Sequence, residues 1–409
     1  MYRKTIDPYL VFIVMMLVIL GVVMISSVSV YPSFKITSQY VARGILEEPN
    51  NYFYLSRNFL HLTIGIAVLT FFTKFTYTYL EKYHRIALIL VLSLMSLVLL
   101  IGKELNGAKG WIDIPGLPSI QPVEFAKIGI IIFLAAFIKR KRSLMSSFQD
   151  GAVPYFAIVG VLFILLALQP DFGSILILAP LLVALYYVGG GNPRFIVLIF
   201  IIAGIGAGSV YGLGKLGGDE SRSKLFYISK RIDSFFQSSE TLFASKESSN
   251  QDYQIKQGLT AIGSGGFGGL GFGKSIQKFG YLPEVQGDFI FSVFVEELGF
   301  LGAFFLIIIY LTIIYRGYHI ARGVKDPFGK YLAFGITTLI LIQVFVNIGV
   351  NLNVIPLTGV TLPFVSYGGS SLIALMAGIG ILLNISRYVE FKSQSGGYEF
   401  VKKRRVYHE

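Results

Sequence analysis

Long, uninterrupted runs of apolar residues constrain this sequence more than any other feature. A helix needs about 20 such residues to cross the ~30 Å hydrocarbon core of a bilayer. Only 14% of the 409 residues are charged, whereas about a quarter are charged in a soluble domain. We therefore expect an all-α, polytopic membrane protein that forms one domain over residues 1–409. Ten spans are predicted, at residues 9–30, 59–75, 86–102, 122–138, 152–168, 174–190, 195–213, 289–315, 331–352 and 367–386.

The distribution of charge predicts how these spans are oriented. The net charge is +12, and basic residues gather in alternate short loops, most densely at 139–142 and again in the tail at 402–405. By the positive-inside rule, both termini and the tail 387–409 lie in the cytoplasm. The segment 214–288 is then a large outer loop before the eighth span. Basic loops also attract anionic lipids, and their scatter argues against a nucleic-acid surface. The predicted location is the cytoplasmic (inner) membrane.

Two classes of cofactor site are excluded. Residues 268–275 match the P-loop pattern and residues 263–268 match the dinucleotide-binding pattern. Both motifs function only inside a strand–turn–helix unit, whereas these glycines lie in an outward loop between spans. The chain has no cysteine and four scattered histidines, so no protein metal-ligand set is predicted. Within the loop, 219–250 is polar and serine-rich, and 253–288 is rich in glycine and aromatic residues and is expected to be ordered.

Acidic residues near the membrane are the candidates for chemistry, because a charge at membrane depth is costly. Glu124 and Lys127 are three residues apart on one helix face, so they form either a structural ion pair or a substrate contact. Asp171 follows Pro170 in a tight outer turn, where a structural role is favoured. Glu296 and Glu297 point to different faces of a helix, and a structural network with partners such as Lys127 is favoured.

Asp288 stands immediately before the eighth predicted span. One interpretation is a helix N-cap, which would lower the pKa of the carboxyl. The other is catalytic, since Lys274 and Lys278 precede it in the same loop. An acid that accepts a hydroxyl proton beside cations that hold a pyrophosphate leaving group is what glycosyl transfer requires.

At these residues the chain resembles the SEDS family of cell-wall polymerases, which includes FtsW, RodA and SpoVE. The resemblance covers nearly the whole chain. The matching blocks are Asn106–Lys109 with Trp111, Gln121-Pro122 with Glu124 and Lys127, Gln169–Asp171, Tyr227–Phe235, Tyr253-Gln254 with Gln257, Gly263–Gly273, Tyr281–Gly299 and Pro356–Ser371.

The resemblance implies a ten-helix glycosyltransferase that polymerises lipid II at the outer face of the membrane. The essential acid of the family falls on Asp288. The implied partners are a class B penicillin-binding protein as transpeptidase and the divisome or elongasome, and a divalent cation, Mg²⁺ or Mn²⁺, is a candidate cofactor. The end of the first span, Val23–Ser29, favours an FtsW-like member. The candidate substrate-binding residues are Lys109, Glu124, Lys127, Asp171, Lys274, Lys278, Gln286 and Ser366.

The chain departs from the family pattern at two places, and two other functions are considered. Gln286-Gly287 stands where His-Thr is usual before the acid, so a titrating group is lost there, and Gly110 stands where arginine is common. One alternative is a transporter that flips lipid II, which charged residues at membrane depth would suit. The other is a non-catalytic scaffold that activates a partner synthase.

Overall fold

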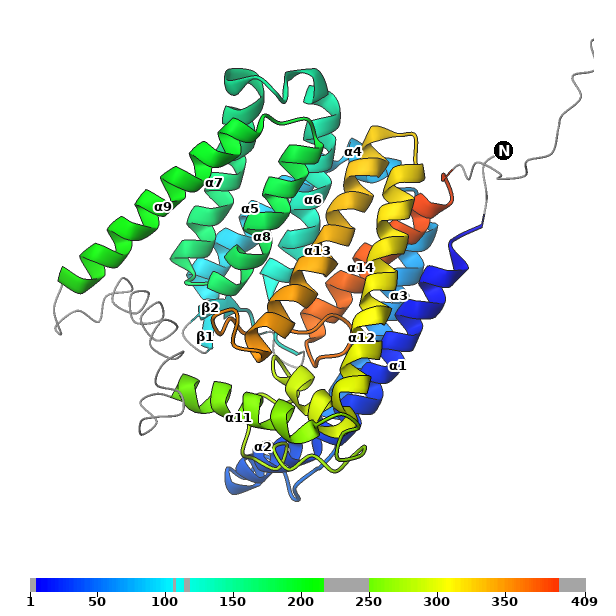
Figure 1. Cartoon of the computed structure of the whole chain (residues 1–409), viewed down its shortest axis with the longest axis vertical. Helices are drawn as coiled ribbons and strands as arrows, with labels where there is room; N and C mark the ends of the chain where they lie inside the picture. The colour runs from blue at the N-terminus through cyan, green and yellow to red at the C-terminus, as the bar shows by residue number, and fades with distance from the viewer. Residues whose placement is uncertain (1–4, 106–107, 114–117, 217–249, 390–409) are drawn as a thin grey trace, which may run out of the picture.

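The computed structural model describes residues 5–105, 108–113, 118–216 and 250–389, and within them the chain is almost entirely helical (Figure 1). A two-stranded antiparallel hairpin, β1 (Lys103–Leu105) and β2 (Ala108–Trp111), is the only sheet in these residues. The long helices are α1 (Pro8–Val28), α3 (Phe53–Lys74), α5 (His84–Ile101), α6 (Pro122–Lys141), α7 (Val153–Leu168), α8 (Phe172–Val188), α9 (Pro193–Leu216), α12 (Ile290–Gly323), α13 (Pro327–Asn351) and α14 (Gly369–Ser386). The shorter ones are α2 (Val30–Ala42), α4 (Thr78–Lys82), α11 (Asn250–Gly265), a 3-10 turn at Arg142–Leu144 and a π-helical turn at Phe148–Ala152.

Each of the ten predicted spans coincides with one of these long helices. Seven helices in the described part of the chain are long and apolar enough to cross a membrane, which makes this a multi-pass membrane protein. Three of the long helices are not among these seven. Among them, α6 carries charged residues near both of its ends, and α8 is short, with 17 residues. The predicted boundaries are displaced at two places, because α3 begins at Phe53 and α12 continues to Gly323.

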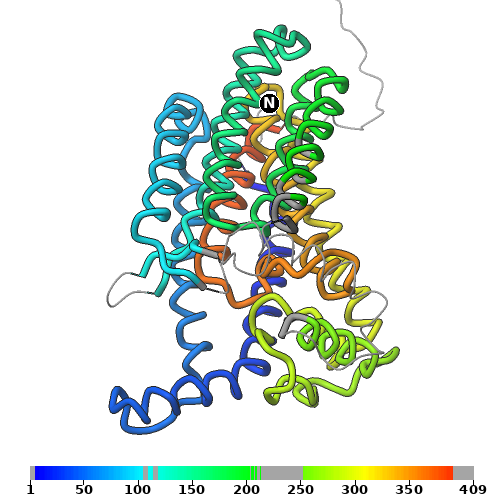
Figure 2. Tube along the Cα trace, turned by 90° about the vertical axis from the view of Figure 1, so that its left-hand side faces the viewer, coloured from blue at the N-terminus to red at the C-terminus, as the bar shows by residue number. Residues whose placement is uncertain are grey.

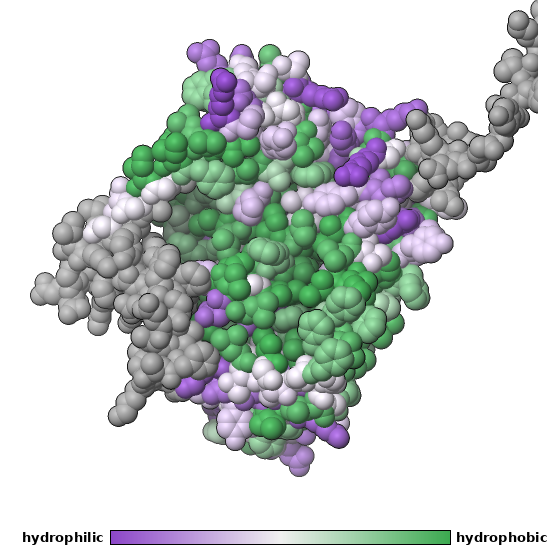
Figure 3. Space-filling view, in the orientation of Figure 1, coloured by the Kyte–Doolittle hydropathy of each residue, from purple (hydrophilic) through white to green (hydrophobic). Residues whose placement is uncertain are grey.

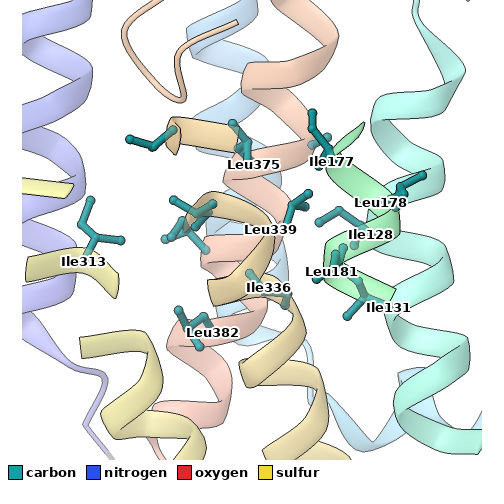
Figure 4. Close-up of a cluster of buried hydrophobic side chains, with 14 of the residues drawn as sticks. Ile128, Ile131, Ile177, Leu178, Leu181, Ile313, Ile336, Leu339, Leu375 and Leu382 are labelled. Atoms are coloured by element: carbon teal, nitrogen blue, oxygen red, sulfur yellow. The ribbon is translucent and has the colours of Figure 1, made fainter. Parts of the chain in front are cut away.

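The core of the bundle lies around α13. Most residues of this helix are buried, and it packs against α6, α8, α12 and α14, while α14 packs along α3. Figure 4 shows apolar side chains such as Ile131, Leu181 and Ile336 converging from α6, α8 and α13. Helix packing of this kind in lipid depends on van der Waals contact. In contrast, α9 diverges from the bundle in Figure 1 and exposes side chains such as Phe200.

The surface matches a protein that crosses a membrane. In Figure 3 a broad apolar band crosses the middle of the visible face, and hydrophilic residues gather above and below this band. Charged residues anchor the upper end in Figure 1: Asp7 caps α1 and pairs with Arg316, and Asp326 caps α13 and pairs with Lys139 at 2.8 Å. Helices α2 and α11 lie at the lower end, and the hairpin lies above them, as the side view in Figure 2 also shows.

A glycine-rich turn locks the outer loop onto α12. This helix is interrupted at Gly299, where φ is +68°, a backbone conformation that favours glycine. At the interruption, the carbonyl oxygens of Glu296 and Glu297 accept hydrogen bonds from the backbone N–H groups of Leu270 and Gly271, at 2.9 and 3.0 Å. The glycines are thus needed for close backbone approach. The segment follows helix α11 and not a strand, so it lacks the strand–turn–helix arrangement that both nucleotide motifs require.

Three features singled out in the sequence lie outside the described residues. They are most of the serine-rich segment 219–250, which includes Tyr227–Phe235, the pair Asn106-Gly107, and the C-terminal tail from residue 390 onward. The remainder of the outer loop, from Asn250 to Phe289, consists of α11 and a series of turns that lead directly to α12.

Candidate active site

Asp288 lies at the lower end of the bundle, at the point where the outer loop enters α12. The residue is only 9% exposed, and within the described residues its Oδ1 atom has no hydrogen-bond partner. Its backbone carbonyl accepts hydrogen bonds from two side-chain amides of α13, Asn347 Nδ2 at 2.9 Å and Asn351 Nδ2 at 2.8 Å. Because α13 fixes the backbone of this residue, the carboxyl group is held in place although it lies at the end of a loop.

The environment of Asp288 raises the pKa of its carboxyl to about 7. Burial is the main cause, and the negative charge of Glu284 adds to it, while backbone N–H groups of residues 288 and 289 oppose both. The N-cap position of α12 is Phe289, and no side chain caps this helix. The expectation that Asp288 caps the helix and therefore has a lowered pKa is wrong, because desolvation outweighs the hydrogen bonds.

A tight turn brings a second carboxyl group near Asp288. Glu284 has a φ of +52°, and its carbonyl accepts a hydrogen bond from the N–H of Gly287 at 2.9 Å. Although Glu284 is exposed as a residue, the surrounding protein desolvates its carboxyl and raises its pKa. Two acids that share one site disfavour each other's ionised form, so Glu284 contributes to the raised pKa of Asp288.

The segment Pro356–Ser371 packs directly against the turn that carries Asp288. The N–H of Tyr367 donates to the carbonyl of Gln286 at 2.8 Å, and Asn347 also donates to the carbonyl of Val360 at 2.8 Å. Ser366 is buried, and its hydroxyl accepts the N–H of Leu362 at 2.8 Å. Ser366 therefore stabilises the segment from within. Gln286 is also buried, and its side-chain carbonyl oxygen Oε1 has no partner among the residues described.

Sequence reasoning missed an aromatic and basic wall beside this turn. The ring of Tyr367 packs edge-on against Tyr54 of α3, with ring centroids 5.0 Å apart. Burial raises the pKa of Tyr367 to about 12, although a hydrogen bond and the charge of Arg57 oppose the rise. Arg57 is exposed and lies over the ring of Phe53 at 4.2 Å. Its position at the outer end of a predicted span was the signal that could have identified it.

Glu124 and Lys127 form a buried ion pair, with Lys127 Nζ 2.8 Å from Glu124 Oε1. Their side chains are 10% and 2% exposed, so the pair lies inside the bundle near the start of α6. This helix is connected to the segment Pro356–Ser371, because the N–H of Gln121 donates to the hydroxyl of Ser370 at 2.9 Å. The predicted pairing is confirmed.

Asp171 precedes α8, and Lys109 lies in the neighbouring strand β2 at the same end of the bundle. Asp171 is the N-cap of α8 and accepts hydrogen bonds from the N–H and the hydroxyl of Ser174, at 3.0 and 2.7 Å. This is the structural role that its sequence context favoured. The N–H of Lys109 donates to the carbonyl of Gln169 at 3.1 Å, and its ammonium group donates to the carbonyl of Leu99 at 2.7 Å.

Lys278 is buried and has its own partners. Its Nζ atom lies 2.8 Å from both Glu297 Oε1 and Ser27 Oγ of α1. Glu296 accepts hydrogen bonds from the Ser275 hydroxyl and from the N–H of Ile276. The predicted structural network is therefore present, but Lys127 is not part of it. That expectation is wrong because the three-residue spacing gives Lys127 a nearer carboxylate on its own helix. Lys274 follows the glycine turn, and its N–H donates to the carbonyl of Gly271 at 3.0 Å.

The fold brings most of the predicted residues together at one end of the bundle. Asp288 and Gln286 contact the segment that contains Ser366, and this segment is linked to α6 with Glu124 and Lys127. In the described part of the chain, no three His, Cys, Asp or Glu side chains are grouped so that they could hold a metal ion. Glu284 and Asp288 are the two carboxyl groups at the site. They do not form a self-sufficient metal site, and no chemical step proposed below depends on a metal.

Comparisons with known proteins identify relatives over nearly the whole length. Residues 8–391 match the family described as "Cell cycle protein", which comprises FtsW, RodA and SpoVE. The stage V sporulation protein E of Bacillus subtilis (strain 168) is 35% identical over 388 residues, which cover 94% of this chain and 98% of that protein. The probable peptidoglycan glycosyltransferase FtsW of the same organism is 37% identical over 391 residues, which cover 95% and 92% of the two chains.

A solved structure also superposes on this one. It is described as "Structural coordination of polymerization and crosslinking by a peptidoglycan synthase complex", and one of its chains matches with a TM-score of 0.73 and 26% identity. The match covers 93% of this chain and 98% of that one. The resemblance seen in the sequence is confirmed, and the chain belongs to the FtsW, RodA and SpoVE family of cell cycle proteins.

Proposed function

We propose that this protein is a peptidoglycan glycosyltransferase that polymerises lipid II into glycan strands. The observation that carries the proposal is the buried carboxyl of Asp288, with one oxygen unpartnered among the described residues and a pKa raised to about 7. A general base is most effective when its pKa lies near the working pH, and such a base is what activates a sugar hydroxyl.

The proposed reaction needs one proton transfer and one displacement. Asp288 accepts the proton of the 4-hydroxyl group on the acceptor sugar, and that oxygen attacks the anomeric carbon of the lipid-linked donor. The bond between the anomeric carbon and the phosphate oxygen breaks, and undecaprenyl pyrophosphate leaves with the electron pair. Because Asn347 and Asn351 fix the backbone of Asp288, the base is preorganised for the acceptor hydroxyl.

The leaving pyrophosphate requires cations. Lys109, Lys274 and Lys278 were predicted for this role, and in this conformation the ammonium groups of Lys109 and Lys278 donate to protein oxygens. The exposed Arg57 beside Tyr367 is a further candidate. Arg57 suits the role, since a guanidinium group can hold two phosphate oxygens at once. Mg²⁺ or Mn²⁺ stays a proposed cofactor, but no step is assigned to it, because in the described residues no three His, Cys, Asp or Glu side chains are grouped to hold a metal ion.

The proposed orientation places Asp288 at the outer face of the cytoplasmic membrane, with ten spans and both termini inside. It is supported by the basic cluster at 139–142, which ends α6 at the end of the bundle opposite Asp288. We propose a class B penicillin-binding protein as the transpeptidase partner, since the superposed chain comes from a peptidoglycan synthase complex. An FtsW-like role in division is favoured by the FtsW and SpoVE relatives.

Reconstitution of the full chain with lipid II, with and without its partner synthase, tests this proposal. Glycan strands resolved by gel electrophoresis are expected when a transpeptidase-inactive partner is supplied. Vesicles that move labelled lipid II across the bilayer without forming strands would instead establish a transporter. Strands that require this chain but form equally well with its Asp288→Asn variant would establish a scaffold role, because the partner would then do the chemistry.

A further inference from the structure

A cavity of about 410 Å³ lies at the end of the bundle opposite Asp288. It opens where the C-terminal end of α8 meets the hairpin that connects α12 to α13, near the upper end of Figure 1. The proposed reaction uses none of its residues. The cavity is lined by Val188, Tyr318, Ala321, Arg322, Lys330 and Phe334.

Two cations and no acid line this cavity. Arg322 is in the last turn of α12 and is exposed, and Lys330 is near the start of α13 and is half-buried. Among the residues that the structure describes, neither has a salt bridge. The acid that caps α13, Asp326, is already engaged, since its Oδ1 binds Lys139 at 2.8 Å and its Oδ2 accepts the N–H of Gly329 at 3.1 Å. The two cations are therefore available to an anion.

The wall of the cavity is aromatic and aliphatic. The rings of Tyr318 and Phe334 pack with their centroids 5.4 Å apart, and the hydroxyl of Tyr318 is 3.0 Å from that of Thr338. Tyr318, Phe334 and Val188 therefore contribute mainly apolar surface to the lining of the cavity, since the Tyr318 hydroxyl already has a partner. The site thus combines positive charge with a surface suited to hydrocarbon.

We propose that this cavity binds an anionic phospholipid from the adjacent leaflet of the membrane. Arg322 and Lys330 contact the phosphate of the head group, and the wall formed by Tyr318, Phe334 and Val188 receives the first methylene groups of the acyl chains. Basic pockets between membrane helices are suited to anionic head groups. A zwitterionic lipid brings a positive charge next to these two cations and binds less well.

The test uses the full chain, purified in detergent and titrated with phosphatidylglycerol or phosphatidylcholine. Bound lipid is counted by native mass spectrometry. The double variant Arg322→Gln/Lys330→Gln removes both cations, and the control Lys82→Gln/Arg85→Gln removes two exposed cations that lie outside the cavity. A third variant, Val188→Trp, fills the cavity and keeps its charge.

Wild type and the control are expected to retain phosphatidylglycerol over phosphatidylcholine. The cavity double variant should weaken phosphatidylglycerol binding at least ~10-fold. Val188→Trp should also weaken this binding, with a melting temperature equal to that of wild type. Equal retention by the cavity double variant and the control overturns the proposal. Displacement of the lipid by millimolar inorganic phosphate also overturns it, because the site would then bind a free anion. The control pair shows whether loss of charge alone explains any effect.

Discussion

Replacement of Asp288 by asparagine should stabilise the folded protein at pH 8. The ionised carboxyl is disfavoured by burial, which raises its pKa from the ordinary 3.8 to about 7. Asparagine has nearly the same shape but cannot ionise, so the variant does not bear the cost of a buried negative charge. Its amide also lacks partners, but so does one oxygen of the wild-type carboxyl.

The magnitude follows from the difference in pKa between the folded and unfolded states. Each pKa unit corresponds to about 1.36 kcal/mol. A rise in the pKa of Asp288 from 3.8 to about 7 therefore corresponds to about 4 kcal/mol. Below pH ~4 the group is neutral in both states and the cost is absent. The cost grows as the pH rises from about 4 to about 7, because only the unfolded state releases its proton easily, and it is constant above that range.

Thermal unfolding in detergent between pH 4 and pH 9 measures this effect. The melting temperature of Asp288→Asn should exceed that of wild type at pH 8, and the difference should vanish toward pH 4. The exposed Asp150→Asn serves as a control and should show no such dependence on pH. A variant that melts at or below the wild-type temperature at pH 8 would refute the reasoning, because Asp288 would then contribute to stability as an ordinary ionised residue.

Three further substitutions test the surroundings. Glu284→Gln should move the acidic limb of the activity profile to lower pH, since one cause of the raised pKa of the catalytic carboxyl is removed; an unchanged profile would contradict this. Lys127→Met should lower the free energy of unfolding by about 3–5 kcal/mol, because it leaves Glu124 buried and unpaired. In a denaturation assay, the double variant Glu124→Gln/Lys127→Met should regain most of this lost stability. Gly269→Ala should lower the melting temperature clearly, since an added Cβ would lie 2.2 Å from a carbonyl oxygen of α12. Gly268→Ala has open space and should melt like wild type.

The helices were predictable because lipid leaves a spanning segment little choice. Every backbone polar group must be satisfied within the membrane, so the run at 331–352 predicted α13 within a few residues. The ion pair of Glu124 and Lys127 was also predictable, because a spacing of three residues places two side chains on one helix face. Local sequence determines both features.

The properties of Asp288 could not be predicted, because they depend on residues far away in the chain. Its backbone is fixed by hydrogen bonds from Asn347 and Asn351, about 60 residues later. The sequence alone suggested a helix cap at this position as one interpretation, and a cap implies a lowered pKa of the carboxyl. Likewise, the helix interruption at Gly299 could not be predicted, because a glycine within an apolar run does not by itself indicate a break in the helix.

The central claim is that the Asp288 carboxyl is the general base, and polymerisation of lipid II by the complex with the partner synthase tests it most directly. Wild type should form glycan strands with a rate that rises with pH through about 7. Asp288→Asn, folded and melting at or above the wild-type temperature, should be slower by about 10²–10⁴-fold, the usual contribution of a general base. If Asp288→Asn polymerises lipid II at the wild-type rate, the carboxyl is not the base and the account is contradicted.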